Sequence, residues 1–152
     1  MKIDQKWVLR FMDLALLVSS WSKDPSCQVG TVIVSPDGRQ ISLGYNGLPR
    51  GMKDDEAILH DQEWKNALMV HAEVNALANC AVSPVGWTMV TTKFPCHECA
   101  KMIIQEGIAC VVAPSWEHPD DKQSKWADSQ ELAEQLMEAV RIEIVLLDLH
   151  GC

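Results

Sequence analysis

Two short groups of residues carry side chains that could hold a metal ion and move a proton. Cys96 and Cys99 are three positions apart at the expected start of a helix, so both sulfur atoms face the same way. A helix N-terminus favours the thiolate form of cysteine, and two thiolates so placed form half of a zinc site. Taken alone, this spacing is also typical of a redox pair or of a structural zinc knuckle.

The second group, His71-Ala72-Glu73, favours a catalytic metal. His71 precedes another expected helix and can supply a nitrogen ligand beside the two thiolates. Three protein ligands leave the fourth tetrahedral position of Zn²⁺ to water, whose pKa the metal lowers towards about 7. Glu73 can take a proton from that water and return it elsewhere. The plainer alternative is a core histidine next to a surface carboxylate.

Together the two groups complete the pattern H-x-E…P-C-x-x-C, the signature of zinc-dependent nucleobase deaminases. His97 lies between the two cysteines and is expected to point away from them. Glu98 is expected to act only as a negative charge at a helix N-terminus. The remaining histidines have no ligand spacing; they are His60, His118 and His150.

Further motifs make the chain resemble the deoxycytidylate (dCMP) deaminases of the cytidine deaminase superfamily. They are Ser22-Lys23-Asp24-Pro25 with Gln28-Val29-Gly30, Gly44-Tyr45-Asn46-Gly47-Leu48-Pro49-Arg50-Gly51 with Asp54-Asp55, and the two groups above. The likeness runs from about residue 14 to residue 113. The zinc motif alone is shared with tRNA adenosine, riboflavin-pathway and cytidine deaminases, whereas the other two motifs favour dCMP.

The resemblance implies hydrolytic deamination of dCMP to dUMP, a step of pyrimidine deoxynucleotide metabolism that supplies dTTP. Zinc-activated water would attack C4 of cytosine, and Glu73 would carry a proton to N3 and then to the leaving ammonia. Lys23 is the expected counter-charge for the phosphate, with a solvated lysine as the alternative, and Asn46 is expected to contact the sugar hydroxyl. The substrate-binding residues so implied are Ser22, Lys23, Asp24, Asn46, Ala72 and Ser115.

Members of this family are commonly hexamers that dCTP activates and that dTTP inhibits, with Mg²⁺ bound to the triphosphate. The resemblance therefore implies a homo-oligomer, with a hexamer expected, and an effector site for dCTP or dTTP. The candidate effector residues are Gly47, Arg50, Asp54 and Asp55. Arg50 is also a weaker candidate for the substrate phosphate, and the two aspartates could equally be plain loop carboxylates.

The chain departs from the family after the expected fourth strand. Many relatives carry Ser-Asp-Lys-Tyr there, where this chain has Ser115-Trp116-Glu117-His118, followed by Asp120 and Asp121. The altered rim could accept another substrate, such as dCTP or a 5-substituted dCMP. Trp116 either stacks on the base or packs against its own loop.

Periodicity and helix or strand breakers predict the elements that must position these residues. Helices are expected over 5–20, 71–81, 96–106 and 128–140, with a shorter one near 60–67, and strands over 29–34, 40–45, 87–92, 108–113 and 142–147. Asp128 and Glu131 resemble a capping box for the last helix. The order predicts a single domain over 1–152 with a three-layer α/β/α, cytidine deaminase-like fold. Its sheet is a central five-stranded mixed sheet, whose last two strands are parallel.

Composition limits the partners. The chain has 13 Lys+Arg against 21 Asp+Glu, a net charge of −8, which repels polyanions and argues against nucleic-acid partners. The first alternative is a deaminase of the tRNA adenosine type, which this charge opposes because such an enzyme must hold a polyanion. The second alternative is a zinc-stapled binding domain without activity. Glu73 argues against the second, because a structural zinc site has four protein ligands and needs no free carboxylate.

Localisation and cysteine state follow from the same sequence. No run of 18 apolar residues and no signal-peptide pattern are present, so a cytoplasmic protein without membrane contact is expected. The six cysteines are then expected to be reduced. Cys27, Cys80 and Cys110 are interpreted as core residues, and Cys152 as a terminal one.

Overall fold

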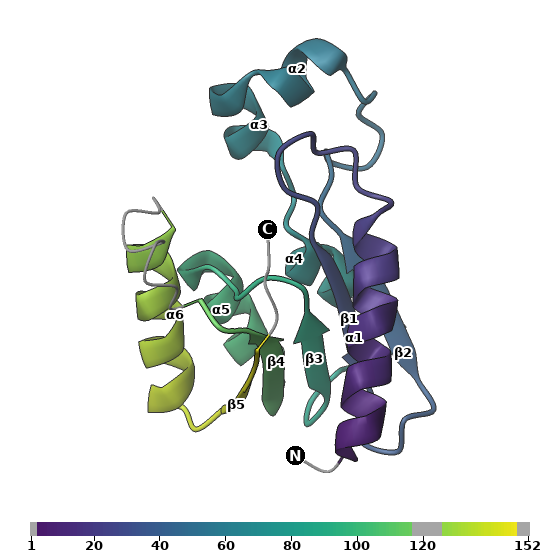
Figure 1. Ribbon diagram of the computed structural model, residues 1–152, viewed down its shortest axis with the longest axis vertical. Helices are drawn as coiled ribbons and strands as arrows, with labels where there is room; N and C mark the ends of the chain where they lie inside the picture. Colours follow the sequence, from purple (N-terminus) through teal and green to yellow (C-terminus); the bar gives the residue numbers. More distant parts are fainter. Residues whose placement is uncertain (1–2, 117–125, 149–152) are drawn as a thin grey trace.

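The structure is a computed structural model that describes residues 3–116 and 126–148. Figure 1 shows the arrangement of its helices and strands. In chain order they are α1 (Gln5–Ser19), β1 (Gly30–Val34), β2 (Ile41–Tyr45), α2 (Glu56–His60), α3 (Gln62–Leu68), α4 (Ala72–Ala78), β3 (Thr88–Thr91), α5 (His97–Gln105), β4 (Cys110–Pro114), α6 (Ala127–Ala139) and β5 (Glu143–Leu147).

The sheet has the strand order β2-β1-β3-β4-β5. Strand β1 pairs antiparallel with β2 and β3, whereas β3, β4 and β5 run parallel. Helices α5 and α6 make the two crossovers between the parallel strands (Figure 1). The predicted fold class, a mixed five-stranded sheet with its last two strands parallel, is therefore confirmed.

Alternation of apolar side chains along the strands builds two core layers. Val32 and Val34 face α1, while Ile33 between them faces the opposite side of the sheet. On that side the buried core includes residues of α4, α5 and α6, such as Ala76, Ile103 and Met137. Every residue of β1 and β4 is buried, as expected for β-branched strands covered on both faces.

Two local predictions differ from the structure. The long connection contains two short helices, α2 and α3, instead of one. The last helix begins at Ala127, with Trp126 at the N-cap position and no side-chain capping bond. Asp128 therefore lies in the first turn, where its charge suits the helix dipole, and the predicted capping box is wrong. No helix in the two described ranges is long and apolar enough to cross a membrane.

The cysteine prediction holds at some positions and fails at one. Cys80, Cys96, Cys99 and Cys110 are free thiols. Cys27 is disulfide-bonded, so the expectation of a reduced core thiol is wrong there. Its side chain is half-buried on the loop between α1 and β1 rather than enclosed between sheet and helix. Cys152 lies outside the described residues.

Gly44 lets α4, which carries the candidate catalytic residues, pack directly on β2. A Cβ atom at this position would lie 2.3 Å from Ala76 N and 2.4 Å from Ala72 O, both backbone atoms of α4. We expect Gly44→Ala to lower the free energy of unfolding by on the order of 1–3 kcal/mol, because neither atom can move by side-chain rotation. Urea denaturation measures this loss. Gly47→Ala is the control, since the nearest atom there is 4.0 Å away; equal stability of the two variants would contradict the packing.

Candidate active site

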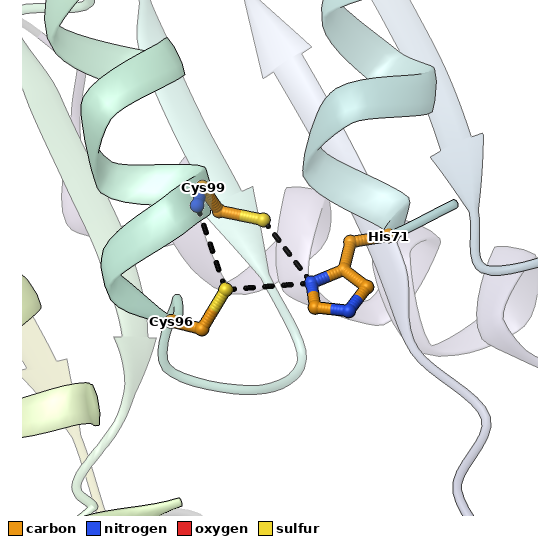
Figure 2. A group of neighbouring side chains, drawn as sticks. All are labelled: His71, Cys96 and Cys99. Carbon is orange, nitrogen blue, oxygen red and sulfur yellow. Dashed lines mark hydrogen bonds between the residues drawn. The ribbon is translucent and has the colours of Figure 1, made fainter. Parts of the chain in front are cut away.

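Three side chains capable of binding a metal converge at the N-termini of α4 and α5 (Figure 2). His71 Nδ1 lies 3.3 Å from Cys99 Sγ and 3.5 Å from Cys96 Sγ. Nitrogen and sulfur ligands of one tetrahedral Zn²⁺ are roughly 3.5 Å apart, given the usual zinc–ligand bond lengths. The donor set therefore fits Zn²⁺ in number, type and spacing.

Helix-capping geometry places these ligands. Cys96 is the N-cap of α5, and its sulfur accepts a hydrogen bond from Cys99 N at 3.4 Å. His71 is the N-cap of α4 and makes no side-chain capping bond, so its imidazole is directed at the sulfurs instead. Both N-caps have extended backbone, and the two helix starts lie side by side (Figure 2). The helix dipoles favour thiolates here.

The two thiols differ in their affinity for protons. Hydrogen bonds from Cys99 and His71 lower the pKa of Cys96 to about 4, although burial opposes the shift. The adjacent Cys96 sulfur, together with burial, raises the pKa of Cys99. The hydrogen bond with Cys96 raises the pKa of His71. Zinc binding requires both sulfurs as thiolates, so metal affinity at this pair depends on pH.

Glu73 lies in the first turn of α4 and is buried, with 5% of its surface exposed. Burial raises the pKa of its carboxyl group. The side chain approaches Cys99 but is not part of the ligand group. A carboxyl group that is buried next to a metal site, without being a ligand, is suited to proton transfer.

The cluster opens into a cavity of about 310 Å³, a size typical of small-molecule sites. Its walls come from the loop after α1, the end of β2, helix α3 and the starts of α4, α5 and α6. The lining residues are Asp24, Ser26, Cys27, Val29, Asn46, Gln62, Lys65, Asn66, Met69, His71, Ala72, Glu73, Lys93, Phe94, Cys96 and Trp126.

Three of the six residues predicted to bind substrate line this cavity: Asp24, Asn46 and Ala72. Ser22 is buried behind it and donates a hydrogen bond to the backbone oxygen of Asn46 at 2.8 Å. Lys23 is 65% exposed outside the cavity and pairs with Asp54. Ser115 also lies outside, and its backbone N–H bonds to Leu147 at the sheet edge.

Asp24 accepts hydrogen bonds from two segments of the cavity wall, the 24–27 loop and helix α3. Its Oδ1 accepts hydrogen bonds from Ser26 N at 2.8 Å, Cys27 N at 3.2 Å and Lys65 Nζ at 2.9 Å. Asn46 Nδ2 donates to Cys27 O at 2.9 Å and approaches Asp24 Oδ2 at 3.4 Å. The loop over 24–27, the end of β2 and helix α3 are therefore linked through one carboxylate.

Acid is expected to weaken this link. Burial alone would raise the pKa of Asp24, but hydrogen bonds from Lys65, Ser26 and Cys27 together hold it below its usual value of 3.8. A lowered folded-state pKa contributes stability above the unfolded pKa, and this contribution disappears as the pH falls through the folded pKa. We expect Asp24→Asn to be less stable than wild type at pH 7, with a gap that shrinks below about pH 4. Urea denaturation at both pH values tests this; a constant gap would contradict it.

The candidate effector residues already have partners within the chain. Gly47 forms an isolated bridge with Val70, and Arg50 donates to the side chain of Asn79. Asp54 pairs with Lys23, while Asp55 caps α2 by accepting a hydrogen bond from Ala57 N at 2.8 Å. None of the four lines the cavity formed by the described residues.

Trp126 and Phe94, rather than Trp116, line the cavity with aromatic rings. Trp116 packs near Phe94, with ring centroids 6.2 Å apart, and its Nε1 donates to Glu134 at 3.2 Å. Trp126 lines the cavity with its ring edge-on to that of His71, with centroids 6.3 Å apart. Trp116 therefore packs against Phe94 and α6 and does not line the cavity, whereas the loop that follows it lies outside the described residues. Glu117, His118, Asp120 and Asp121 lie outside the described residues.

His97 points away from the cluster, as predicted. Its Nδ1 lies 2.8 Å from Ser129 Oγ on α6, and its Nε2 lies 3.1 Å from Glu98 Oε1. Glu98 also pairs with Lys101 at 2.8 Å, consistent with a surface charge at the start of α5. These contacts dock α6 against α5 and leave three residues as the metal group.

Sequence reasoning missed Lys65, Lys93 and Trp126, which all line the cavity. None of them belongs to a motif. Lys65 lies on a short helix in a long connection, and Trp126 follows an acidic loop. Among them, the burial of Lys65 between α3 and the 24–27 loop could not be inferred from helix periodicity alone.

Comparisons with known proteins agree with this geometry. The chain is 39% identical over 144 residues to an uncharacterised deaminase encoded 3′ of luxG in Aliivibrio fischeri, covering 95% of both chains. It is 38% identical over 125 residues to human deoxycytidylate deaminase, covering 78% of this chain and 70% of the human one. The dCMP deaminase of cyanophage S-TIM5, solved in complex with dCMP and dUMP, is 25% identical with a TM-score of 0.71, covering 95% of this chain and 99% of the phage enzyme.

The family model of the cytidine and deoxycytidylate deaminase zinc-binding region matches residues 5–114. This span includes α1, the 24–27 loop, Asn46 and the whole candidate metal group. The chain therefore belongs to the cytidine and deoxycytidylate deaminase family.

Proposed function

We propose that the protein catalyses the hydrolytic deamination of dCMP to dUMP. The observation that carries the proposal is the buried Glu73 carboxyl group beside His71, Cys96 and Cys99 at one wall of a nucleotide-sized cavity. The likeness to human deoxycytidylate deaminase and to the phage enzyme that binds dCMP and dUMP supports this choice of substrate.

The residues of the chain divide the chemistry between them. His71, Cys96 and Cys99 would hold Zn²⁺, which supplies an acidified water with a pKa near 7 when bound. Glu73 would accept a proton from the attacking water and pass it to N3 of cytosine. It would then take the proton of the new C4 hydroxyl group and give it to the amino group, so that the C4–N bond breaks and ammonia leaves. Its raised pKa suits a group that must alternate between acid and base near neutral pH.

The walls of the cavity orient the nucleotide. Because Ala72 and Asn46 line the cavity, we propose that Ala72 contacts the base and Asn46 the sugar, while Ser22 acts through its hydrogen bond to Asn46. Trp126 offers an aromatic face or edge next to His71, against which a pyrimidine ring can pack. Asp24 lines the cavity, whereas the substrate roles of Lys23 and Ser115, which lie outside it, rest on the resemblance alone. The altered stretch after residue 114 extends the proposal to dCTP and 5-substituted dCMP.

Regulation and assembly form a separate part of the proposal. By the resemblance of its 44–55 segment to dCMP deaminases, the protein would form a homo-hexamer in the cytoplasm. We propose that dCTP activates this hexamer and that dTTP inhibits it together with Mg²⁺. Because Arg50, Asp54 and Asp55 hold partners within the chain, an effector phosphate must displace or extend those contacts. Sedimentation with and without dCTP plus Mg²⁺ tests the assembly, and initial rates under the same conditions test the regulation.

Ammonia release from a substrate panel tests the proposed function. Zinc-loaded protein is assayed with dCMP, dCTP, 5-methyl-dCMP, CMP, deoxycytidine and a tRNA. Turnover of the dCMP-type nucleotides, with none on tRNA, is the expected result. Activity on tRNA alone would instead indicate an RNA-editing deaminase, and zinc binding without any turnover would indicate a structural zinc domain.

A further inference from the structure

A nucleotide substrate brings a phosphate with close to two negative charges at neutral pH, and its site must supply cationic donors. Within the described ranges, two lysines line the cavity, Lys65 and Lys93. Lys23, the counter-charge suggested by the sequence, is not one of them, because its side chain is largely exposed and pairs with Asp54. The structure thus provides a different cation from the one that the motif suggests.

Lys65 is a buried lysine whose ammonium group is held by polar side chains. The residue is only 3% exposed, and its Nζ lies 2.9 Å from Asp24 Oδ1 and hydrogen-bonds to Ser26 Oγ. An ammonium group has three N–H donors, of which these contacts use two. The same α3 wall brings the amide side chains of Gln62 and Asn66 to the cavity. Gln62 Nε2 donates to Asn66 Oδ1 at 2.9 Å, so the amide nitrogen of Asn66 and the ammonium of Lys65 are the donors that this wall offers to an anion.

Asp24 fixes this cation without removing its donor capacity. The carboxylate also accepts hydrogen bonds from Ser26 N and Cys27 N, so its charge is shared with neutral donors. A buried ion pair adds little net stability, because desolvation offsets the attraction between the charges. Its position at the cavity gives it another use: an ammonium already held in place needs no further ordering when a ligand binds.

Lys93 belongs to another wall of the cavity. It lies three residues before Cys96, and its positive charge opposes protonation of His71. Its ammonium is 5.5 Å from the centroid of Trp126 and 3.8 Å from Cys27 Sγ. These contacts place Lys93 with the metal group and the aromatic wall, where the base must lie for attack at C4.

We propose that Lys65, held by Asp24, recognises the 5′-phosphate of the substrate and makes the enzyme select nucleotides over nucleosides. The inference rests on the proposed function and names the residue of this chain that defines its substrate class. The phosphate would accept the remaining N–H of Lys65, close to Ser26 and to the amides of α3.

Equilibrium binding of the product tests the assignment without turnover. Calorimetry compares dUMP with deoxyuridine on zinc-loaded wild type, Asp24→Asn, and the double variant Asp24→Asn/Lys65→Met, in which no buried charge is left unpaired. We expect the double variant to bind dUMP at least about tenfold more weakly, with deoxyuridine affinity unchanged. Asp24→Asn keeps the Lys65 ammonium but removes the carboxylate that holds it, so its preference for dUMP should fall between those of wild type and the double variant. Lys101→Met, on the exposed face of α5, is the surface-charge control.

Three results would overturn the role of Lys65. A wild-type ratio of dUMP to deoxyuridine affinity in the double variant would show that Lys65 does not bind phosphate. Equal weakening of both ligands would show a structural role only, and loss of the ratio in Lys93→Met alone would move the phosphate to the other wall. Should the double variant fail to fold, Asp24→Asn/Lys65→Gln gives the same comparison, because it also leaves no buried charge unpaired. A parallel dCMP assay on wild type separates the two proposals, since absence of dUMP formation there overturns the proposed function itself.

Discussion

Replacing Glu73 with glutamine is expected to reduce turnover of dCMP by about 10²- to 10⁴-fold while leaving the protein folded and zinc-loaded. Glutamine keeps the size of the side chain but cannot accept and return a proton. Glu73 is buried and is not a member of the metal group, so its loss should act on proton transfer and not on metal affinity. The measurement is kcat for dCMP together with zinc content for both proteins.

The control for this variant is Glu98→Gln, which changes an exposed carboxylate on the neighbouring helix. We expect Glu98→Gln to retain wild-type turnover, because its partners are Lys101 and His97 on the outer face. If Glu73→Gln kept near-normal turnover with zinc bound, Glu73 could not be the proton carrier and the assigned mechanism would be wrong.

Replacing Cys99 with serine is expected to abolish both stoichiometric zinc binding and detectable deamination. Cys99 is buried, and its sulfur lies 3.3 Å from His71 Nδ1 in the metal group. A hydroxyl group is a much poorer ligand for zinc than a thiolate, and two remaining protein ligands do not make a catalytic site. Metal analysis after gel filtration, with rates measured on the same samples, checks both losses.

Cys80→Ala is the matched control, because Cys80 is also a free thiol but packs at the end of α4 away from the metal group. It should keep zinc and activity. Loss of zinc in both variants to the same degree would indicate nonspecific destabilisation. Full zinc occupancy in Cys99→Ser would contradict the ligand assignment.

The metal group was predictable because its residues carry the chemistry in short, fixed spacings. Cys96 and Cys99 lie at the start of α5, and His71 is the N-cap of the preceding helix, α4, which lies beside it. Continuous β-branched runs such as Gly30–Val34 likewise predicted strands of the sheet, since burial on both faces favours those side chains. Local sequence therefore determined both features.

The substrate walls were less predictable, because they depend on contacts between distant segments. Lys65 meets Asp24 across 41 positions of sequence, and no local periodicity encodes that pairing. Trp116 and Trp126 lie in one stretch of chain, and only the packing of α6 on the sheet decides which of them reaches the cavity.

The most direct test of the central claim is conversion of dCMP by zinc-loaded protein in water enriched in ¹⁸O. Hydrolytic deamination replaces the amino group at C4 with oxygen from water, so mass spectrometry should find dUMP carrying one ¹⁸O on the base. Glu73→Gln should form this product at least about 10²-fold more slowly, and Cys99→Ser should form none over the same time. Unchanged dCMP after prolonged incubation with the zinc-loaded wild type would contradict the account.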